Sequence, residues 1–125
     1  MTQPDQISIQ ATSRYLIEKS LPESDQFVFA YTITIKNKSS STIQLLSRHW
    51  VIVDANGKHE EVIGEGVIGE QPTINSGESY TYSSGAILET EVGTMTGFYE
   101  FKFSDDSIKK ARIPRFTLSV PRTLH

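Results

Sequence analysis

The chain of 125 residues is long enough for one domain, residues 1–125, that buries roughly two thirds of its unfolded surface. Hydrophobic residues make up 37% and charged residues 22%, which excludes a disordered or membrane-embedded protein. The sequence has no cysteine, which excludes a disulfide framework, a thiolate zinc site and a cysteine nucleophile.

The first residues show neither the basic nor the apolar segment of a signal peptide, and the longest apolar run, from Phe27 to Tyr31, is too short to cross a bilayer. We therefore expect a cytoplasmic protein without a membrane partner. The net charge of -3 disfavours nucleic acid as a partner. Residues 54–91 hold eight acids and one base, whereas residues 107–125 hold five bases and no acid. We expect these segments to neutralise each other or to form two solvated faces, in preference to a basic patch for an acidic partner.

Strand signals recur along the chain, with β-branched and aromatic residues alternating with polar ones. In chain order, the predicted strands cover residues 7–18, 26–36, 43–54, 58–63, 79–88, 98–103 and 108–120. Pro114 has no amide to donate and must break or bulge the last strand. Seven or eight strands without a helical period indicate an all-β, antiparallel β-sandwich of the immunoglobulin or fibronectin type III kind. The missing cysteine pair favours the fibronectin variant, and Trp50 is the predicted buried tryptophan.

Asn56 and Gly57 lie between two strand signals, which is typical of a two-residue type I′ hairpin. If these are the two loop residues, Asp54 faces His59, Trp50 faces Ile63, and Arg48 faces Glu65. This register brings Arg48 and His49 close to the glycine-rich segment that follows.

Three glycines in this segment match the pattern GxGxxG, which in dinucleotide-binding folds places a pyrophosphate at a helix N-terminus. Here Pro72 and another strand signal follow, so no helix is available. The glycines instead indicate a bulged or irregular crossing between sheets, where positive φ is required. Their amides remain an alternative anion-binding nest, although Glu65 and Glu70 would repel a pyrophosphate. The residues concerned are Gly64, Gly66 and Gly69.

Catalysis by a Ser or Thr needs an oriented histidine, and no such pair is visible. His59 is expected beside a hairpin tip and His125 is terminal, so His49 alone is retained as a candidate ligand contact. Clustered carboxylates suit a hard cation, but their spacing matches no known metal loop, and solvated surface acids are the favoured interpretation. The four acids are Glu60, Glu61, Glu65 and Glu70. We expect neither an enzyme nor a cofactor.

The sequence resembles the ApaG family of small bacterial proteins over nearly its whole length. The resemblance rests on residues 29–35, 45–50, 62–72, 82–85, 93–99 and 113–116, with Leu118. It implies a fibronectin type III-like sandwich and an association with cobalt resistance and magnesium efflux. Similar domains in eukaryotes are joined to F-box proteins and to a polymerase-interacting protein, which implies a protein-binding module. Pyrophosphate or nucleotide binding has also been proposed for the family from its glycine motif.

Three functions follow as expectations. The first is a non-enzymatic protein-interaction module whose surface includes the glycine segment, Arg48 and the strand at residues 82–85. The second is a binder of pyrophosphate or nucleotide through the amides of that segment and Arg48. The third is divalent-cation binding or sensing through the acid cluster. The candidate ligand or partner residues are Arg48, His49, Gly64, Glu65, Gly66 and Gly69.

Overall fold

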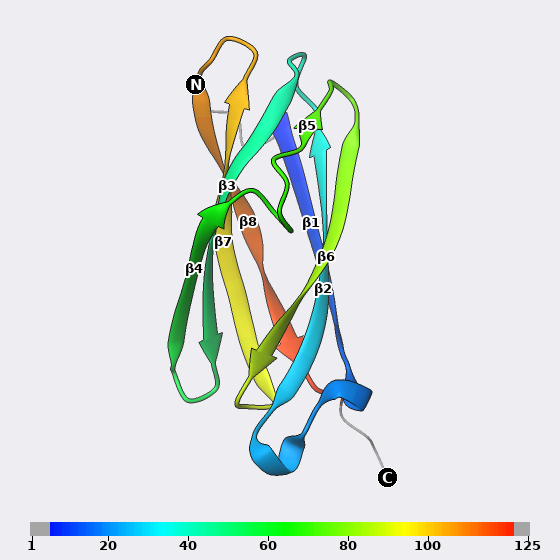
Figure 1. Cartoon of the computed structure of the whole chain (residues 1–125), viewed down its shortest axis with the longest axis vertical. Helices are drawn as coiled ribbons and strands as arrows, with labels where there is room; N and C mark the ends of the chain where they lie inside the picture. Colours follow the sequence, from blue (N-terminus) through cyan, green and yellow to red (C-terminus); the bar gives the residue numbers. More distant parts are fainter. Residues whose placement is uncertain (1–5, 122–125) are drawn as a thin grey trace.

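Two antiparallel sheets pack face to face in the computed structural model, which describes residues 6–121 (Figure 1). Within these residues, the smaller sheet has the order β1-β2-β6, and the larger has the order β4-β3-β7-β8, with β5 pairing beside β3. This confirms the predicted all-β sandwich of seven or eight strands, of which the described residues contain eight. The strands are β1 (Ile7–Tyr15), β2 (Phe27–Asn37), β3 (Ile43–Asp54), β4 (His59–Glu65), β5 (Thr73–Ile74), β6 (Ser79–Leu88), β7 (Val92–Phe103) and β8 (Ile108–Ser119). Two short 3-10 helices, η2 (Ile17–Lys19) and η3 (Pro22–Ser24), connect β1 to β2.

β2 supplies one wall of the core, because every second residue points between the sheets. Phe29, Ile33 and Ile35 are fully buried, and the alternate Thr32 and Thr34 point outward, where their hydroxyls bond to Ser83 and Thr81 of β6. The larger sheet supplies the other wall. Its central member is Trp50, which is 2% exposed, as predicted.

The sandwich is closed along one side and open along the other. At the closed side β1 lies against β8, and the Ser13 hydroxyl donates to the Thr117 carbonyl at 2.8 Å. At the other side the edge strands are β4 and β6, which do not pair with each other (Figure 1). The segment from β4 to β5 crosses between them near one end.

The β3–β4 hairpin differs from its predicted register by one residue. Val53, not Asp54, faces His59, and Arg48 faces Gly64 rather than Glu65. The cause is a three-residue loop, in which the Asp54 amide donates to the Lys58 carbonyl and only Gly57 has positive φ, at 81°. This is a type I turn closed by a left-handed glycine, not the type I′ turn that Asn-Gly favours.

β8 contains the irregularity predicted at Pro114. Met95 pairs with Phe116 and Gly97 pairs with Ile113, so Thr96 alone faces two residues of β8, Pro114 and Arg115. The strand accommodates its proline through this bulge and continues to Ser119.

The acidic and basic segments meet only at one end, where the Val120 amide donates to the Glu91 carbonyl, and mutual neutralisation by ion pairs is not observed among residues 6–121. β8 and β4 are at opposite edges of the larger sheet. Among residues 6–121 the ion pairs are His49–Glu61, Lys58–Glu89 and Lys102–Asp106, and none joins the two segments. The alternative of two solvated faces is the one observed. Arg122 and His125 lie outside the described residues.

Candidate functional site

The glycine segment folds back on β3 through its own backbone. The Gly66 amide donates to the Leu46 carbonyl at 2.8 Å, and Val67 and Glu70 exchange two backbone hydrogen bonds. Ile68 and Gly69 between them have φ of 42° and 80°, which defines a type I′ turn. Val67 is fully buried, and burial of such a side chain stabilises the fold by about 1.5–3 kcal/mol.

Each glycine of the motif has a separate steric reason. A Cβ at Gly64 would lie 2.9 Å from the Arg48 guanidinium, and one at Gly66 would lie 2.0 Å from the Glu70 carbonyl oxygen. Gly69 has open space around it, but its φ of 80° disfavours any side chain. The local backbone therefore requires glycine at Gly66 and Gly69 without any ligand, whereas Gly64 leaves room for the Arg48 side chain.

Arg48 is half-buried, and its side chain is hydrogen bonded to the backbone of the same glycine segment. Its Nη1 donates to the carbonyl oxygens of Glu65 at 3.0 Å and Gly66 at 2.9 Å. The segment thus presents carbonyls to Arg48, while the amides of Gly66, Val67 and Glu70 donate to backbone oxygens. These three amides are already engaged, so an anion-binding nest would have to displace backbone hydrogen bonds.

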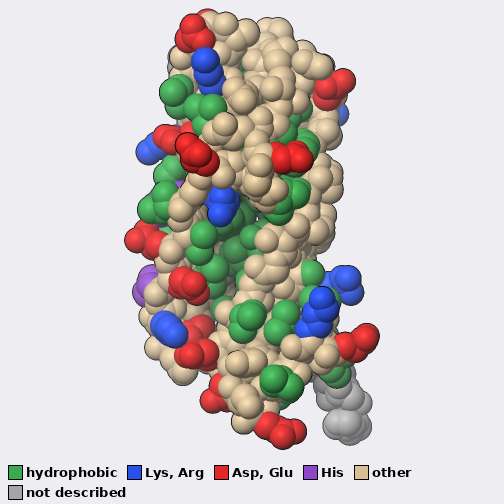
Figure 2. All heavy atoms as spheres, viewed as in Figure 1, with side chains coloured by type: hydrophobic (Ala, Val, Ile, Leu, Met, Phe, Trp, Pro, Cys, Tyr) green, Lys and Arg blue, Asp and Glu red, His purple; other side chains and the backbone are tan. Residues whose placement is uncertain are grey.

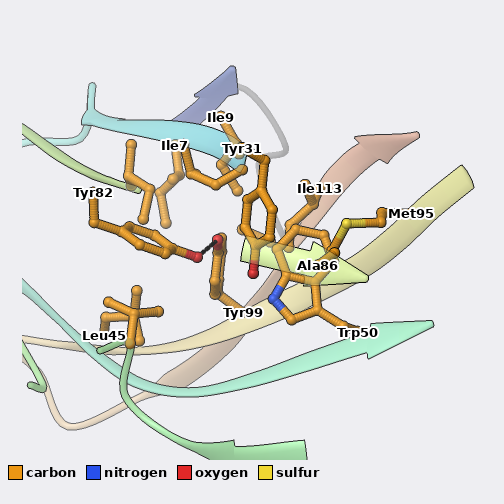
Figure 3. Close-up of a cluster of buried hydrophobic side chains, with 14 of the residues drawn as sticks. Ile7, Ile9, Tyr31, Leu45, Trp50, Tyr82, Ala86, Met95, Tyr99 and Ile113 are labelled. Atoms are coloured by element: carbon orange, nitrogen blue, oxygen red, sulfur yellow. Dashed lines mark hydrogen bonds between the residues drawn. The ribbon is translucent and has the colours of Figure 1, made fainter. Parts of the chain in front are cut away.

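The side chains of Tyr31, Tyr82 and Tyr99 lie together in the core (Figure 3). The hydroxyls of Tyr82 and Tyr99 are hydrogen bonded to each other, and the ring of Tyr31 packs edge-on against Trp50 at 5.5 Å. Burial raises the pKa of Tyr82 and Tyr99, and the positive charge of Arg48 acts in the opposite direction. Within residues 6–121, the buried Trp50 Nε1 has no hydrogen-bond partner.

His49 points to the outer face of the larger sheet, away from Arg48. Its Nε2 lies 2.9 Å from Glu61 Oε2, and its ring packs on Phe98 at 4.9 Å between centroids. The sequence places His49 beside Arg48, but strand alternation puts the two side chains on opposite faces of β3. They cannot form one site.

The four acids are dispersed. Glu61 pairs with His49, Glu70 accepts a hydrogen bond from the Tyr80 hydroxyl at 3.4 Å, and the side chain of Glu65 is exposed. Glu60 lines a small hollow of about 30 Å³ with Asp54 and Lys58. Across residues 6–121, no three acidic or histidine side chains are grouped closely enough to hold a metal ion.

The open side of the sandwich forms a cleft between β4 and β6. Figure 2 shows apolar side chains in this hollow. Near one end of it, Ile52 of β3 lines a small space together with Ile87 and Leu88 of β6. Two side-chain contacts bridge the sheets near the ends of this cleft, Tyr80–Glu70 at 3.4 Å and Lys58–Glu89 at 3.3 Å. We call this feature the edge cleft.

β6 is an open edge along this cleft. Its ten residues contain no charged side chain, no proline and no register shift against β2. Within residues 6–121 no strand pairs with its far side. Edge strands are normally protected by charge, proline or bulges, and β4 has three glutamates for that purpose.

Ile68 is the residue that inspection of the sequence missed. It lies at the tip of the type I′ turn, 57% exposed, with φ of 42°. A β-branched residue rarely adopts positive φ, which costs roughly 1–2 kcal/mol. Strain and apolar exposure at one tip are typical of a contact residue. No sequence signal marks Ile68, because its φ is known only from the folded turn.

Comparison with known proteins agrees with this arrangement. A family model described as the ApaG domain matches residues 17–103. The chain belongs to the ApaG family. ApaG proteins of Thiobacillus denitrificans and Pseudomonas putida are 53% and 52% identical to it over 120 residues, covering 96% of this chain and 94% and 95% of theirs. The crystal structure of the ApaA protein of Bordetella pertussis superposes with a TM-score of 0.90 at 41% identity, covering 94% of this chain and 95% of that one.

The ApaG fold is shared with more distant structures. The C-terminal domain of Wzt superposes with a TM-score of 0.56 at 8% identity, over 95% of this chain and 75% of that one, which shows likeness of fold alone. Among residues 6–121 of this ApaG chain, no helix has the length and apolar character needed to span a bilayer.

Proposed function

We propose that this ApaG chain is a non-enzymatic module that binds an extended segment of a partner protein along the edge of β6. The observation that carries the proposal is the open edge itself, ten residues long and without charge, proline or bulge. An added strand would satisfy the outward backbone groups of β6, and its alternate side chains would cover the edge cleft. A predominantly apolar segment fits this surface best.

Ile68 supplies the apolar anchor in this proposal. It is on the segment that Glu70 and Tyr80 connect to the start of β6. A partner that buries Ile68 would recover free energy from a side chain held in a strained, exposed position. The glycine segment therefore acts by shaping a contact surface, and Arg48 acts by holding that segment in place.

The proposed place of action is the cytoplasm. The family's link to cobalt resistance and magnesium efflux is compatible with a binding module, because such a module acts on ion transport through its partner. The proposal requires neither a bound metal nor a catalytic residue in the chain.

The test selects binders from displayed random peptides of about ten residues, the length of β6. We expect selected peptides to be rich in β-branched and aromatic residues and to protect β6 amides from hydrogen exchange. Thr81→Lys places a charge on this edge and should weaken binding at least about tenfold. The matched control is Thr12→Lys on β1, the other edge strand of the same sheet, which should bind as the wild type does. Failure to select any peptide, or protection confined to other strands, contradicts the proposal.

The variant Ile68→Asn tests whether Ile68 contributes to peptide binding independently of its effect on stability. Asparagine tolerates positive φ, so the variant should be about 1 kcal/mol more stable to denaturant unfolding than the wild type. The same variant should bind selected peptides more weakly, because the apolar contact is lost. If Ile68→Asn leaves peptide affinity unchanged, Ile68 is not the anchor.

A further inference from the structure

A second hollow lies on the outer face of the larger sheet, on the side away from the edge cleft. It measures about 410 Å³, and its lining includes His49, Phe98, Arg112 and Arg115. We call it the outer hollow. It is independent of β6 and Ile68, so its function can be tested without reference to the proposed interaction with a partner.

The bulge at Pro114 builds the outer hollow. Strict alternation would place Arg112 and Arg115 on opposite faces of β8, because they are three residues apart. The extra residue of β8 opposite Thr96 shifts the alternation of inward and outward side chains by one position. Ile113 and Phe116 therefore both point into the core. Arg112 and Arg115 are consequently both exposed on the outer face. Bulges often re-aim side chains in this way next to functional sites.

The charged side chains that line the outer hollow are positive, and two carboxylates lie beside it, Glu61 opposite Val51 and Glu100 opposite Lys110. Within residues 6–121, neither Arg112 nor Arg115 forms an ion pair, and no carboxylate belongs to the lining. Lys110 adds a further cation, with Nζ 4.7 Å from the Phe98 ring centroid. The nearest described acid to His49 is Glu61, already paired with it at 2.9 Å. This basic region lies on a chain whose net charge is -3.

The floor of the outer hollow is aromatic. Phe98 and His49 pack together at 4.9 Å between centroids, tilted by 32°. Gly97 allows β7 to come close to β3 here, because a Cβ at this position would lie 2.1 Å from the His49 carbonyl oxygen. The hollow therefore combines an apolar, partly exposed ring with two guanidinium groups.

We propose that the outer hollow binds a small phosphate monoester, with the phosphate between Arg112 and Arg115 and the organic part against Phe98. A phosphate dianion matches two guanidinium groups, each of which can donate two parallel hydrogen bonds to its oxygens. The volume of about 410 Å³ accommodates a group larger than phosphate alone.

The test titrates the full-length protein with phenyl phosphate and follows backbone and arginine side-chain signals by NMR. We expect saturable shifts centred on Gly97, Phe98, Arg112 and Arg115 at millimolar ligand, and weaker binding of inorganic phosphate, which lacks the ring. Shifts that are scattered over the surface, or that sodium sulfate reproduces at equal ionic strength, overturn the proposal. Binding of a phosphoserine peptide but not of phenyl phosphate also overturns it.

Matched variants distinguish a built site from general charge attraction. Arg112→Ala and Arg115→Ala should each weaken phenyl phosphate binding at least about tenfold. Arg112→Lys keeps the charge but loses the planar fork, so it should also weaken binding. The control is Arg14→Ala on β1, an exposed arginine of the other sheet, which should bind normally. Equal losses in Arg14→Ala and Arg112→Ala would show attraction by net charge only and contradict the proposal.

Discussion

At the scale of single residues, the glycine motif is explained by backbone geometry. Gly66 combines a φ of 62° with close approach to the Glu70 carbonyl, whereas Gly69 has only the positive φ. The motif therefore marks a turn that docks Val67 into the core. The same pattern in a strand-turn-helix unit would serve a pyrophosphate, so the surrounding elements decide its meaning.

Substituting these two glycines should distinguish the free-energy cost of positive φ from the additional cost of a steric clash. Gly69→Ala adopts the left-handed conformation at a cost of about 1–2 kcal/mol in the free energy of unfolding. Gly66→Ala has the same cost and must also displace backbone, which adds about 1–3 kcal/mol. Denaturant unfolding of both variants measures the difference. Equal losses would mean that the Gly66 contact relaxes freely.

At the scale of elements, loop length decides which side chains meet. A hairpin loop with one more residue than Asn-Gly predicts shifts the whole of β4 by one position against β3. Arg48 therefore lies over Gly64, the one residue there without a side chain, instead of opposing Glu65. The contact between Arg48 and the glycine segment depends on this register.

The type of turn in the β3–β4 hairpin predicts how substitutions in its loop affect stability. Only Gly57 has positive φ in this loop, so Gly57→Ala should cost about 1–2 kcal/mol of unfolding free energy. Asn56→Ala should change it by less than about 0.5 kcal/mol, because Asn56 is exposed and not left-handed. Urea denaturation provides the comparison. Similar losses in both variants would indicate the two-residue type I′ turn instead.

At the scale of the whole molecule, the sandwich has one closed side and one open side. The side where β1 meets β8 is closed, and the tyrosine hydroxyls are buried between the sheets. The opposite side leaves β6 and the edge cleft open. One closed side and one open side give a stable fold with an edge available for a partner.

The buried tyrosines predict how stability depends on pH. Burial raises the pKa of Tyr31, Tyr82 and Tyr99, so the folded protein keeps these protons where the unfolded chain releases them. Their contribution is fully present below about pH 10, the pKa of an unfolded tyrosine, and is lost as pH rises further. Each group lowers the free energy of unfolding by about 1.4 kcal/mol per pH unit above that point.

Denaturant unfolding from neutral to alkaline pH measures this effect. The double variant Tyr82→Phe with Tyr99→Phe removes two ionising groups together with their mutual hydrogen bond, and should show a shallower alkaline decline. An unchanged decline in this variant would mean that other groups cause it.

Much of the architecture could be predicted from local chemistry. The alternation in β2, the turn residues and the position of Pro114 correctly indicated an antiparallel sandwich of seven or eight strands with Trp50 in its core. Predictions that required register were less successful. The pairing of Asp54 with His59 was wrong, because it depends on the length of the hairpin loop. Of the two arrangements expected for the acidic and basic segments, only the solvated faces are observed, because strand order separates β4 from β8.

The sequence by itself determined the strands, the core residues and the family, since these follow from patterns within short segments and from residues shared with relatives. Only the tertiary structure decided that Arg48 and His49 face opposite ways, that Arg112 and Arg115 share a face, and that β6 is an open edge. The physical reason is that a strand's side chains alternate locally, whereas bulges, loop lengths and strand order set which faces and edges meet.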